Sequence, residues 1–199
     1  MIANPQINLM SVEEYLEWEP LQEIRYEYFA GELVAMTGGT IPHNDIALNL
    51  YRALYPHVRS KECRINVADV KVQLASGIYF YPDLVVSCDQ RDKDAIKLIQ
   101  HPKLIIEVLS PGTEAYDRGK KFRQYRSMPS LEEYVLIDST QVSVECFRRG
   151  EGKVWLFTPY TAGETVTLES LGFSGAIDQI YEDVQLQPAE VESLEEREN

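Results

Sequence analysis

Two acidic residues of this sequence stand in hydrophobic stretches, where a carboxylate needs an explanation. Glu107 interrupts an apolar run at residues 104–109, and Asp83 follows Pro82 inside the hydrophobic stretch 79–86. An ionised carboxylate among apolar side chains costs several kcal/mol unless it is paired or binds a metal ion. Proline predicts an edge strand or a bulge, and bulges often re-aim side chains beside active sites. The alternatives are a strand-end Glu paired with a base and a solvent-facing Asp.

A predicted helix at about residues 114–127 concentrates positive charge in an acidic chain. Five cations fall within nine of its residues: Arg118, Lys120, Lys121, Arg123 and Arg126. Phe122 and Tyr125 mark the core side of the helix, and Lys121 flanks that side, so its amine could reach back over the sheet. A salt bridge from Lys121 to Asp117, four residues earlier, is the structural alternative. The outward-facing cations form either a solvated face or a surface for phosphate contacts.

Three further residues carry weaker signals. Glu32 follows Gly31 at the start of a predicted strand, where a polar turn residue is the simpler interpretation. His43 opens a predicted helix, so an N-cap or first-turn role is the simpler explanation. Asp69 and Lys71 share one face of a predicted strand, which favours an ion pair with a neighbouring strand. Glu32 is therefore a site candidate, and His43 and Asp69 are accessory candidates.

The hydrophobic spacing predicts the helices that must position these side chains. Ser11 and Glu14 form a capping box that opens a short helix through Trp18. Apolar residues recur every three or four positions from Asn44, which predicts an amphipathic helix that ends at residues 57–60. The cationic helix described above is the third.

Strands make up most of the remaining prediction. Two short strands within residues 25–37 flank a turn at Ala30–Gly31, and residues 65–74 and 79–88 form a hairpin. Residues 103–109 have almost no polar interruption, as expected for a strand buried on both faces. The later strands are predicted at residues 134–138, 142–147, 154–159 and 165–168. This order predicts a mixed α/β (α+β) fold with one central sheet.

The size and charge of the chain narrow its class. With 199 residues it is long enough for a single domain, which we predict for residues 1–187. Residues 188–199 are acidic, and we expect a disordered tail there. The formal net charge of -13 argues against a general nucleic-acid coat, because polyanion binding needs clustered cations. It is compatible with an enzyme that meets phosphates through a metal ion.

Membrane insertion, disulfides and zinc binding are disfavoured by the sequence. No stretch approaches the roughly 18–20 continuous apolar residues of a membrane-spanning helix, and the first residues lack the pattern of a signal peptide. The three cysteines, Cys63, Cys88 and Cys146, are odd in number and have no C-x-x-C spacing. We expect them to be buried free thiols in a reducing cytoplasm.

Three stretches, in this order, resemble a known protein family. They are YPDLVV at residues 81–86, LIIEVLSPGT at 104–113 and YDRGKKFRQY at 116–125. The sequence resembles the Uma-two family of restriction endonucleases, a branch of the PD-(D/E)xK nuclease superfamily, from Glu23 to about Asp183. The resemblance implies a restriction-endonuclease-like core, in which a central mixed sheet is flanked by helices and an acidic pair lies on adjacent strands.

The resemblance also implies the site residues. Asp83 matches the Asp of the PD motif, and Glu107 matches the acid of the (D/E)xK motif. Leu109 stands where the parent pattern has lysine, and Lys121 in the following helix is the matching lysine. Glu32 matches the extra N-terminal acid that many such nucleases bring to the metal. The implied catalytic set is thus Glu32, Asp83, Glu107 and Lys121, of which the three acids are metal ligands.

The implied activity is Mg²⁺-dependent hydrolysis of DNA phosphodiester bonds, with Mn²⁺ as a possible substitute. Mg²⁺ is commonly bound by one or two carboxylates plus waters and phosphate oxygens, and it lowers the pKa of a bound water. Lys121 would orient or help to deprotonate that water, or stabilise the charge that develops on the phosphate. The candidates for phosphate contacts are Arg118, Lys120 and Arg123.

Two other functions use the same residues. The net charge and the missing lysine at Leu109 are compatible with a nuclease-fold binding or regulatory module that has lost hydrolysis. A metal-dependent hydrolase of a small phosphoester would need the same carboxylates. The resemblance also implies a homodimer, because cutting both strands of a duplex suits two-fold symmetry. The sequence indicates neither a membrane nor a protein partner.

Overall fold

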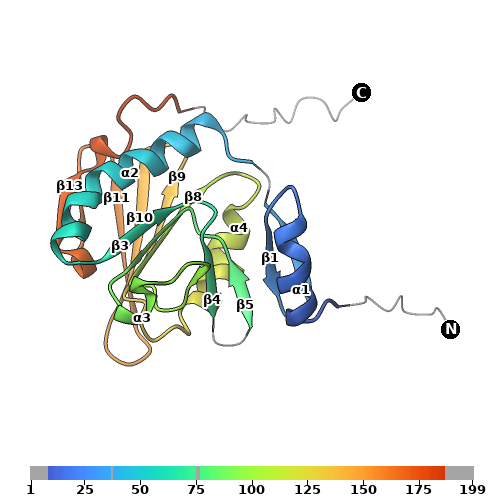
Figure 1. Cartoon of the computed structure of the whole chain (residues 1–199). Helices are drawn as coiled ribbons and strands as arrows, with labels where there is room; N and C mark the ends of the chain where they lie inside the picture. Colours follow the sequence, from blue (N-terminus) through green and yellow to red (C-terminus); the bar gives the residue numbers. More distant parts are fainter. Residues whose placement is uncertain (1–8, 37, 75–76, 187–199) are drawn as a thin grey trace, which may run out of the picture.

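Two mixed β-sheets carry most of this protein in the computed structural model, which describes residues 9–186 except for 37, 75 and 76 (Figure 1). The six-stranded sheet has, in spatial order, β11 (Trp155–Thr161), β10 (Ser143–Arg149), β9 (Glu133–Asp138), β8 (Leu104–Leu109), β6 (Leu84–Ser87) and β3 (Arg64–Val67). The five-stranded sheet has β2 (Glu32–Ala35), β1 (Tyr26–Phe29), β5 (Ile78–Phe80), β4 (Lys71–Leu74) and β7 (Leu98–Ile99). A separate two-stranded sheet joins β12 (Thr165–Leu168) to β13 (Phe173–Ala176). The expected acidic tail at residues 188–199 lies outside the described residues.

The helices comprise the three predicted ones, of which the third is divided, and an additional short helix at residues 90–93. They are α1 (Val12–Trp18), α2 (Ile41–Ser60), α3 (Gln90–Lys93), α4 (Glu114–Tyr116) and α5 (Phe122–Tyr125), with 3-10 turns at Glu19–Leu21, Glu169–Leu171 and Ile177–Gln179. The capping box of α1 is confirmed, because Ser11 and Glu14 each accept a hydrogen bond from the other's backbone N–H. None of the described helices is long and apolar enough to cross a membrane.

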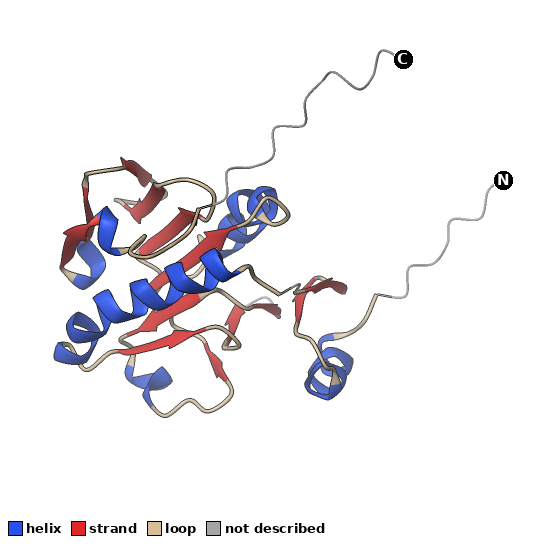
Figure 2. Cartoon of the chain, turned by 90° about the horizontal axis from the view of Figure 1, so that it is seen from above, coloured by secondary structure: helices blue, strands red, loops and turns tan. Residues whose placement is uncertain are grey.

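The long helix α2 covers one face of the six-stranded sheet (Figure 2). Its N-cap is Thr40, whose hydroxyl accepts a hydrogen bond from the backbone N–H of His43. Its buried side chains recur every three or four residues, and they are Ile46, Leu50, Leu54 and Val58. They pack with every second residue of β8, which are Leu104, Ile106 and Val108. The predicted amphipathic helix is therefore confirmed, and it starts three residues before Asn44.

The other residues of β8 face the five-stranded sheet. Ile105 and Leu109 pack there with Val72 and Phe80, and α5 adds Tyr125 to the same core. Because side chains alternate along a strand, Glu107 belongs to this second face. A carboxylate is thereby carried into the core between the two sheets and the cationic helix.

The predicted hairpin of residues 65–74 and 79–88 is divided between the two sheets. Its outer halves, β3 and β6, pair in the six-stranded sheet, and its inner halves, β4 and β5, pair in the five-stranded sheet. Between β3 and β4, Ala68 and Asp69 both have a φ of 48° and form a bend. The expectation that Asp69 and Lys71 share a strand face was wrong, because Asp69 lies exposed in this bend. Lys71 instead pairs with the buried Glu19 at 3.0 Å.

The cysteine prediction was wrong for two of the three residues. Cys63 and Cys88 form a disulfide across 25 residues of sequence, and Cys146 is a buried free cysteine. The reason is the register of β3 and β6, in which Arg64 pairs with Ser87. The residues flanking this pair, Cys63 and Cys88, therefore stand opposite each other, which their spacing in the sequence does not indicate.

The packing of α2 predicts a large difference between two leucines of one helix. Leu54 is fully buried, and Leu54→Ala should lower the free energy of unfolding by about 2–5 kcal/mol because it leaves a cavity. Leu48 is 51% exposed on the same helix, and Leu48→Ala should change it by no more than about 0.5 kcal/mol. Urea unfolding followed by circular dichroism measures both, and equal losses would contradict the described orientation of α2.

Candidate functional site

Lys121 lies at the centre of a buried cluster of carboxylates. Its side chain is only 6% exposed, and its Nζ lies 2.9 Å from Glu107 Oε1, 3.0 Å from Glu27 Oε1 and 3.3 Å from Asp117 Oδ1. Each of the three acids is itself nearly inaccessible to solvent. The predicted pair between Lys121 and Asp117 is thus present, as one of three ion pairs to the same ammonium group.

Different elements deliver these side chains. Glu107 comes from the middle of β8 and Glu27 from β1, whereas Asp117 and Lys121 belong to a π-helical turn, Asp117–Lys121, between α4 and α5. The N–H of Phe122 donates to the carbonyl of Asp117 and so closes the wide turn. Single π-helical turns inside α-helices occur frequently at functional sites.

Asp83 lies next to Glu107 on the adjacent strand. It immediately precedes β6, and in the β6–β8 register Leu84 pairs with Ile106, so that Asp83 stands opposite Glu107. Its Oδ2 accepts a 2.7 Å hydrogen bond from the N–H of Val108. The expectation that the two acids lie on adjacent strands therefore agrees with the structure.

His43, from the first turn of α2, completes this side of the site. Its Nε2 lies 2.9 Å from Asp83 Oδ1, at hydrogen-bonding distance. Burial opposes the charged imidazole, but the hydrogen bond to Asp83 and the charge of that carboxylate outweigh it and raise the pKa of His43. His43 therefore occupies the first turn of the helix and also contacts the site residue Asp83.

The cluster contains more negative than positive groups. Three carboxylates, those of Glu27, Glu107 and Asp117, contact Lys121, and a fourth, that of Asp83, lies beside Glu107 and contacts His43. Burial raises the pKa of Glu107 well above its ordinary value, and the attraction of Lys121 only partly opposes this shift. Burial lowers and the three facing carboxylates raise the pKa of Lys121, and the carboxylates prevail. Lys121 is therefore charged, and the acids around it favour a further cation or a proton.

Unpartnered polar atoms gather around the same cluster. Among the described residues, the buried side-chain atoms that lack a hydrogen bond are His43 Nδ1, Glu107 Oε1, Tyr116 Oη and Tyr125 Oη. Lys121 approaches Glu107 Oε1 as an ion pair without hydrogen-bond geometry. Burial raises the pKa of Tyr125 and so does the charge of Glu107, which places this phenol beside the cluster. Buried polar groups normally have partners, so these four atoms could still accept or donate a hydrogen bond at the cluster.

The donor set fits a hard divalent cation. Within the part of the chain that the structure describes, no three His, Cys, Asp or Glu side chains are arranged as a complete metal site. Mg²⁺ does not need such a site, because it is usually bound by one or two carboxylates and keeps several waters. Asp83 and Glu107 are adjacent, and the carboxylates of the cluster outnumber its lysine. These two side chains could therefore supply carboxylates of this kind.

Glu32 is not brought into the cluster, whereas Glu27 is. Glu32 begins the edge strand β2, and its exposed carboxylate pairs with Lys120 at 2.8 Å. Glu27 lies on the inner strand β1 and is only 3% exposed. The sequence does not mark Glu27 as buried, because tyrosines flank it. Their hydroxyls are polar, so this stretch looks less like a core strand than the aliphatic run around Glu107 does.

The other candidates lie at the surface. Arg118 pairs with Glu114 at 2.6 Å and also with Glu145. Lys120 pairs with Glu32, and Arg123 is exposed. Asp69 is exposed in the bend before β4 and makes no described contact with the cluster. Two of the three proposed phosphate-contacting cations are therefore already paired with acids of this chain.

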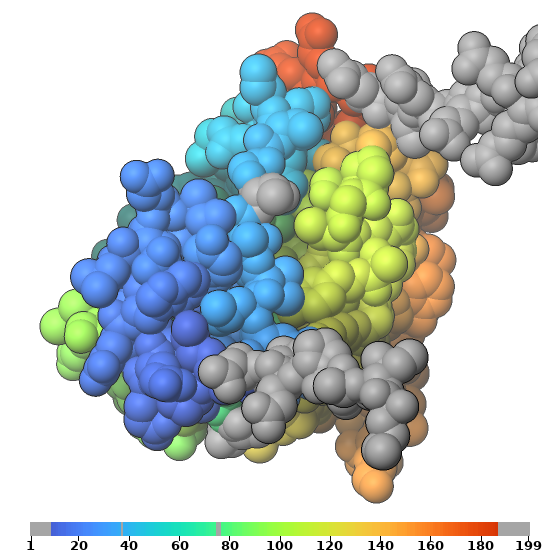
Figure 3. Space-filling model, turned by 90° about the vertical axis from the view of Figure 1, so that its right-hand side faces the viewer, coloured from blue at the N-terminus to red at the C-terminus, as the bar shows by residue number. Residues whose placement is uncertain are grey.

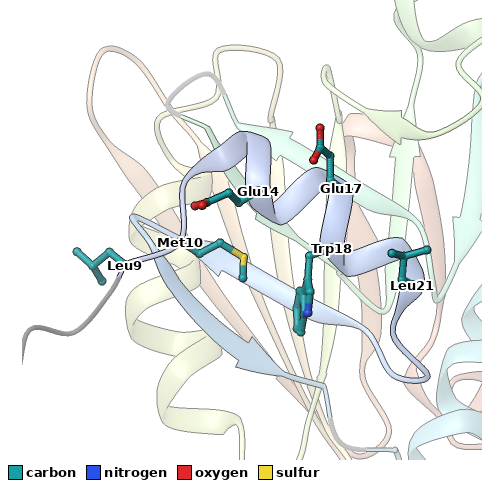
Figure 4. Close-up of a pocket in the computed structure, with 6 residues that line it drawn as sticks. All are labelled: Leu9, Met10, Glu14, Glu17, Trp18 and Leu21. Carbon is teal, nitrogen blue, oxygen red and sulfur yellow. The ribbon is translucent and has the colours of Figure 1, made fainter.

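A surface cavity of about 650 Å³ lies elsewhere, along α1 (Figure 4). Its lining consists of Leu9, Met10, Glu14, Glu17, Trp18 and Leu21. None of these side chains belongs to the carboxylate cluster, so this cavity is separate from the candidate site.

Comparisons with known proteins agree on the family and the fold. The model of the Uma2 family, described as "Putative restriction endonuclease", matches residues 12–178. Two uncharacterized Synechocystis proteins are similar: slr1290 is 41% identical over 86% of this chain and 91% of its own, and sll1609 is 32% identical over 85% and 97%. A crystal structure described as a "putative nuclease belonging to DUF820" from Anabaena variabilis matches with a TM-score of 0.72 at 16% identity, over 86% of this chain and 97% of that chain. The predicted mixed α/β fold with sheet and flanking helices is confirmed, but the expectation of one central sheet was wrong, because the strands divide into two large sheets.

The cluster predicts different consequences for two adjacent lysines. Lys121→Met should lower the free energy of unfolding by about 3–5 kcal/mol, because it leaves buried carboxylates without their counter-charge. Lys120→Met removes a surface pair and should cost no more than about 1 kcal/mol. Thermal and urea unfolding measure both, and equal stability of the two variants would contradict the central position of Lys121.

The same variant should respond to pH in a defined direction. Burial raises the pKa of Glu107 and Asp117 in the folded state, so the folded protein binds more protons than the unfolded chain and gains stability as pH falls. Without Lys121 these two pKa values rise further. The stability difference between Lys121→Met and the unmodified protein should therefore shrink as pH is lowered from about 8 to about 5. Urea unfolding measures this difference in the free energy of unfolding. A difference that stays constant across this range would argue against electrostatic coupling between Lys121 and these two carboxylates.

Proposed function

This chain belongs to the Uma2 family, and on that premise we propose that it is a Mg²⁺-dependent endonuclease that hydrolyses phosphodiester bonds in DNA. The observation that carries the proposal is the convergence of three groups from separate parts of the chain. Asp83 and Glu107 stand on adjacent strands, and Lys121 reaches Glu107 from the following helix at 2.9 Å. Carboxylates can hold a metal ion that activates water, and a lysine can offset developing negative charge, so these three groups suit metal-assisted phosphodiester hydrolysis.

Asp83 and Glu107 would hold the metal. When bound there, Mg²⁺ supplies a water of lowered pKa and offsets negative charge on the phosphate. The N–H of Val108 and the ring of His43 each hold one oxygen of Asp83, which restricts the rotation of this carboxylate. A carboxylate has about four lone-pair positions, so these two contacts leave room for a metal bond.

Lys121 would act as a fixed positive charge beside the reacting phosphate. The three surrounding carboxylates keep its ammonium charged and restrict its position. A preorganised charge of this kind stabilises developing negative charge without reorganising during the reaction. It can also orient the attacking water by donating a hydrogen bond. Glu32 has no part in this proposal, because its carboxylate pairs with Lys120 at the surface.

The charge of the surface favours weak binding of DNA that depends on salt and on metal. The formal net charge is -13, and Arg118 and Lys120 are held by acids of the same chain. Affinity for duplex DNA comes largely from cations that neutralise phosphates. We further propose a homodimer, since two copies related by two-fold symmetry could cut both strands.

A hydrolase of a small phosphoester is the second candidate. The pairing of Arg118 and Lys120 favours it, because few unpaired cations of this helix remain to follow a long polyanion. The same metal and lysine would serve this reaction. A binding or regulatory module without hydrolysis would keep the metal site alone.

Nicking of supercoiled plasmid DNA tests the proposal. Cleavage should require Mg²⁺ or Mn²⁺ and stop with a chelator, and Asp83→Asn and Glu107→Gln should each lower its rate by about 100-fold or more. Asp94→Asn is the matched control, because Asp94 is an exposed acid outside the cluster, and its rate should not change.

Metal binding separates the alternatives. Calorimetry should detect Mg²⁺ binding that Asp83→Asn weakens and Asp94→Asn does not. Metal binding without cleavage of DNA, but with hydrolysis of nucleotide phosphoesters, would favour the second candidate. Binding without any hydrolysis would indicate the regulatory module, and DNA cleavage that survives both Asp83→Asn and Glu107→Gln would remove the proposed site.

A further inference from the structure

We propose that Glu27 is a positioning residue that holds Lys121 in place against Glu107 and joins it to the strand that leads to Asp83. This inference rests on the proposed function of the cluster. It assigns the N-terminal hairpin a direct part in the site, since Glu27 lies in β1 and is buried at 3% exposure.

One oxygen of Glu27 makes two contacts. Its Oε1 accepts a 3.0 Å hydrogen bond from the N–H of Tyr81 and lies 3.0 Å from Lys121 Nζ. Tyr81 stands two residues before Asp83 in the chain. A single carboxylate therefore links the lysine to the backbone segment that carries the first metal-binding candidate.

The lysine lies between Glu27 and the second metal-binding candidate. Nζ of Lys121 is 2.9 Å from Glu107 and 3.0 Å from Glu27, with Asp117 as the third neighbour. An ammonium has three N–H donors, and the ion pair with Glu107 lacks hydrogen-bond geometry, so the three carboxylates do not use all of these donors. Glu27 thus contacts Lys121 rather than the Asp83–Glu107 pair, which distinguishes a positioning role from that of a metal ligand.

The N-terminal segment is attached to the body through the same tyrosine. The hydroxyl of Tyr81 donates to Glu19 Oε1 at 2.8 Å, and Glu19 Oε2 pairs with the buried Lys71. Figure 3 shows the N-terminal segment, in blue, beside the yellow-green segment that contains the π-helical turn. Tyr81 therefore contacts two acids of the N-terminal segment. Its hydroxyl contacts Glu19, and its backbone N–H contacts Glu27, which in turn contacts Lys121.

The test compares two acids of one hairpin. Glu27→Gln keeps the size of the side chain and an oxygen for the N–H of Tyr81, but removes the charge that faces Lys121. Glu32→Gln is the matched control, since Glu32 lies on the adjacent strand β2 and pairs with Lys120 instead of Lys121. Steady-state kinetics on plasmid DNA should show kcat reduced by about 10–100-fold in Glu27→Gln, with KM unchanged. In Glu32→Gln kcat should be unchanged, because this substitution releases Lys120 and leaves the ion pairs of Lys121 intact.

Two measurements do not depend on turnover. Calorimetry should give the same Mg²⁺ affinity for Glu27→Gln as for the unmodified protein. Reductive methylation, followed by mass spectrometry, should label Lys121 faster in Glu27→Gln, because one of its three ion pairs is lost, and should label Lys120 at its original rate. If Glu27→Gln does not fold, Glu27→Asp replaces it, because the shorter side chain withdraws the carboxylate from Lys121 and predicts the same changes.

The outcomes separate this inference from the proposed nuclease function. A fall in Mg²⁺ affinity together with kcat would overturn the positioning role in favour of a metal ligand. Unchanged kcat and unchanged labelling of Lys121 would also overturn it. If the unmodified protein cleaves no DNA, the nuclease proposal fails, and labelling alone decides whether Glu27 positions Lys121.

Discussion

The ammonium group of Lys121 lies in the protein interior with three carboxylates within 3.3 Å, and this arrangement constrains the structure around it. Removing any one of these ions from water costs several kcal/mol, and only close opposite charges offset that cost. The groups must therefore be brought together by elements that fold cooperatively. A strand of each sheet and the π-helical turn meet at this point, so the cluster joins the major parts of the described chain.

The divided hairpin is what makes this meeting possible. Because β3 and β6 belong to one sheet and β4 and β5 to the other, the chain crosses between the sheets at Tyr81–Asp83. Tyr81 contacts Glu27 on the side of the five-stranded sheet, and Asp83 contacts Val108 on the side of the six-stranded sheet. The segment around Pro82 therefore lies where the two sheets meet, and it contacts Glu27 on one side and the strand of Glu107 on the other.

Local patterns were sufficient for most of the elements. The capping box at Ser11 and the apolar spacing of α2 depend on neighbours within a few residues, and the structure confirms both. The division of the hairpin, the second sheet and the disulfide between Cys63 and Cys88 were not predicted. They depend on which strands pair, and pairing is decided by contacts between segments far apart in the chain.

The sequence by itself determined which residues of the central strands and the cationic helix were unusual. A charged residue inside an aliphatic run is costly to bury unless it is paired or binds a metal ion. This cost singled out Glu107 and, together with the neighbouring Pro82, Asp83. Only the tertiary structure decided which other groups join them. Glu27 and Glu32 lie five residues apart on one hairpin, yet Glu27 reaches Lys121 and Glu32 reaches Lys120. The reason is physical: β1 is an inner strand and β2 an edge strand, and burial at a site depends on the neighbours of a strand, which its own residues do not specify.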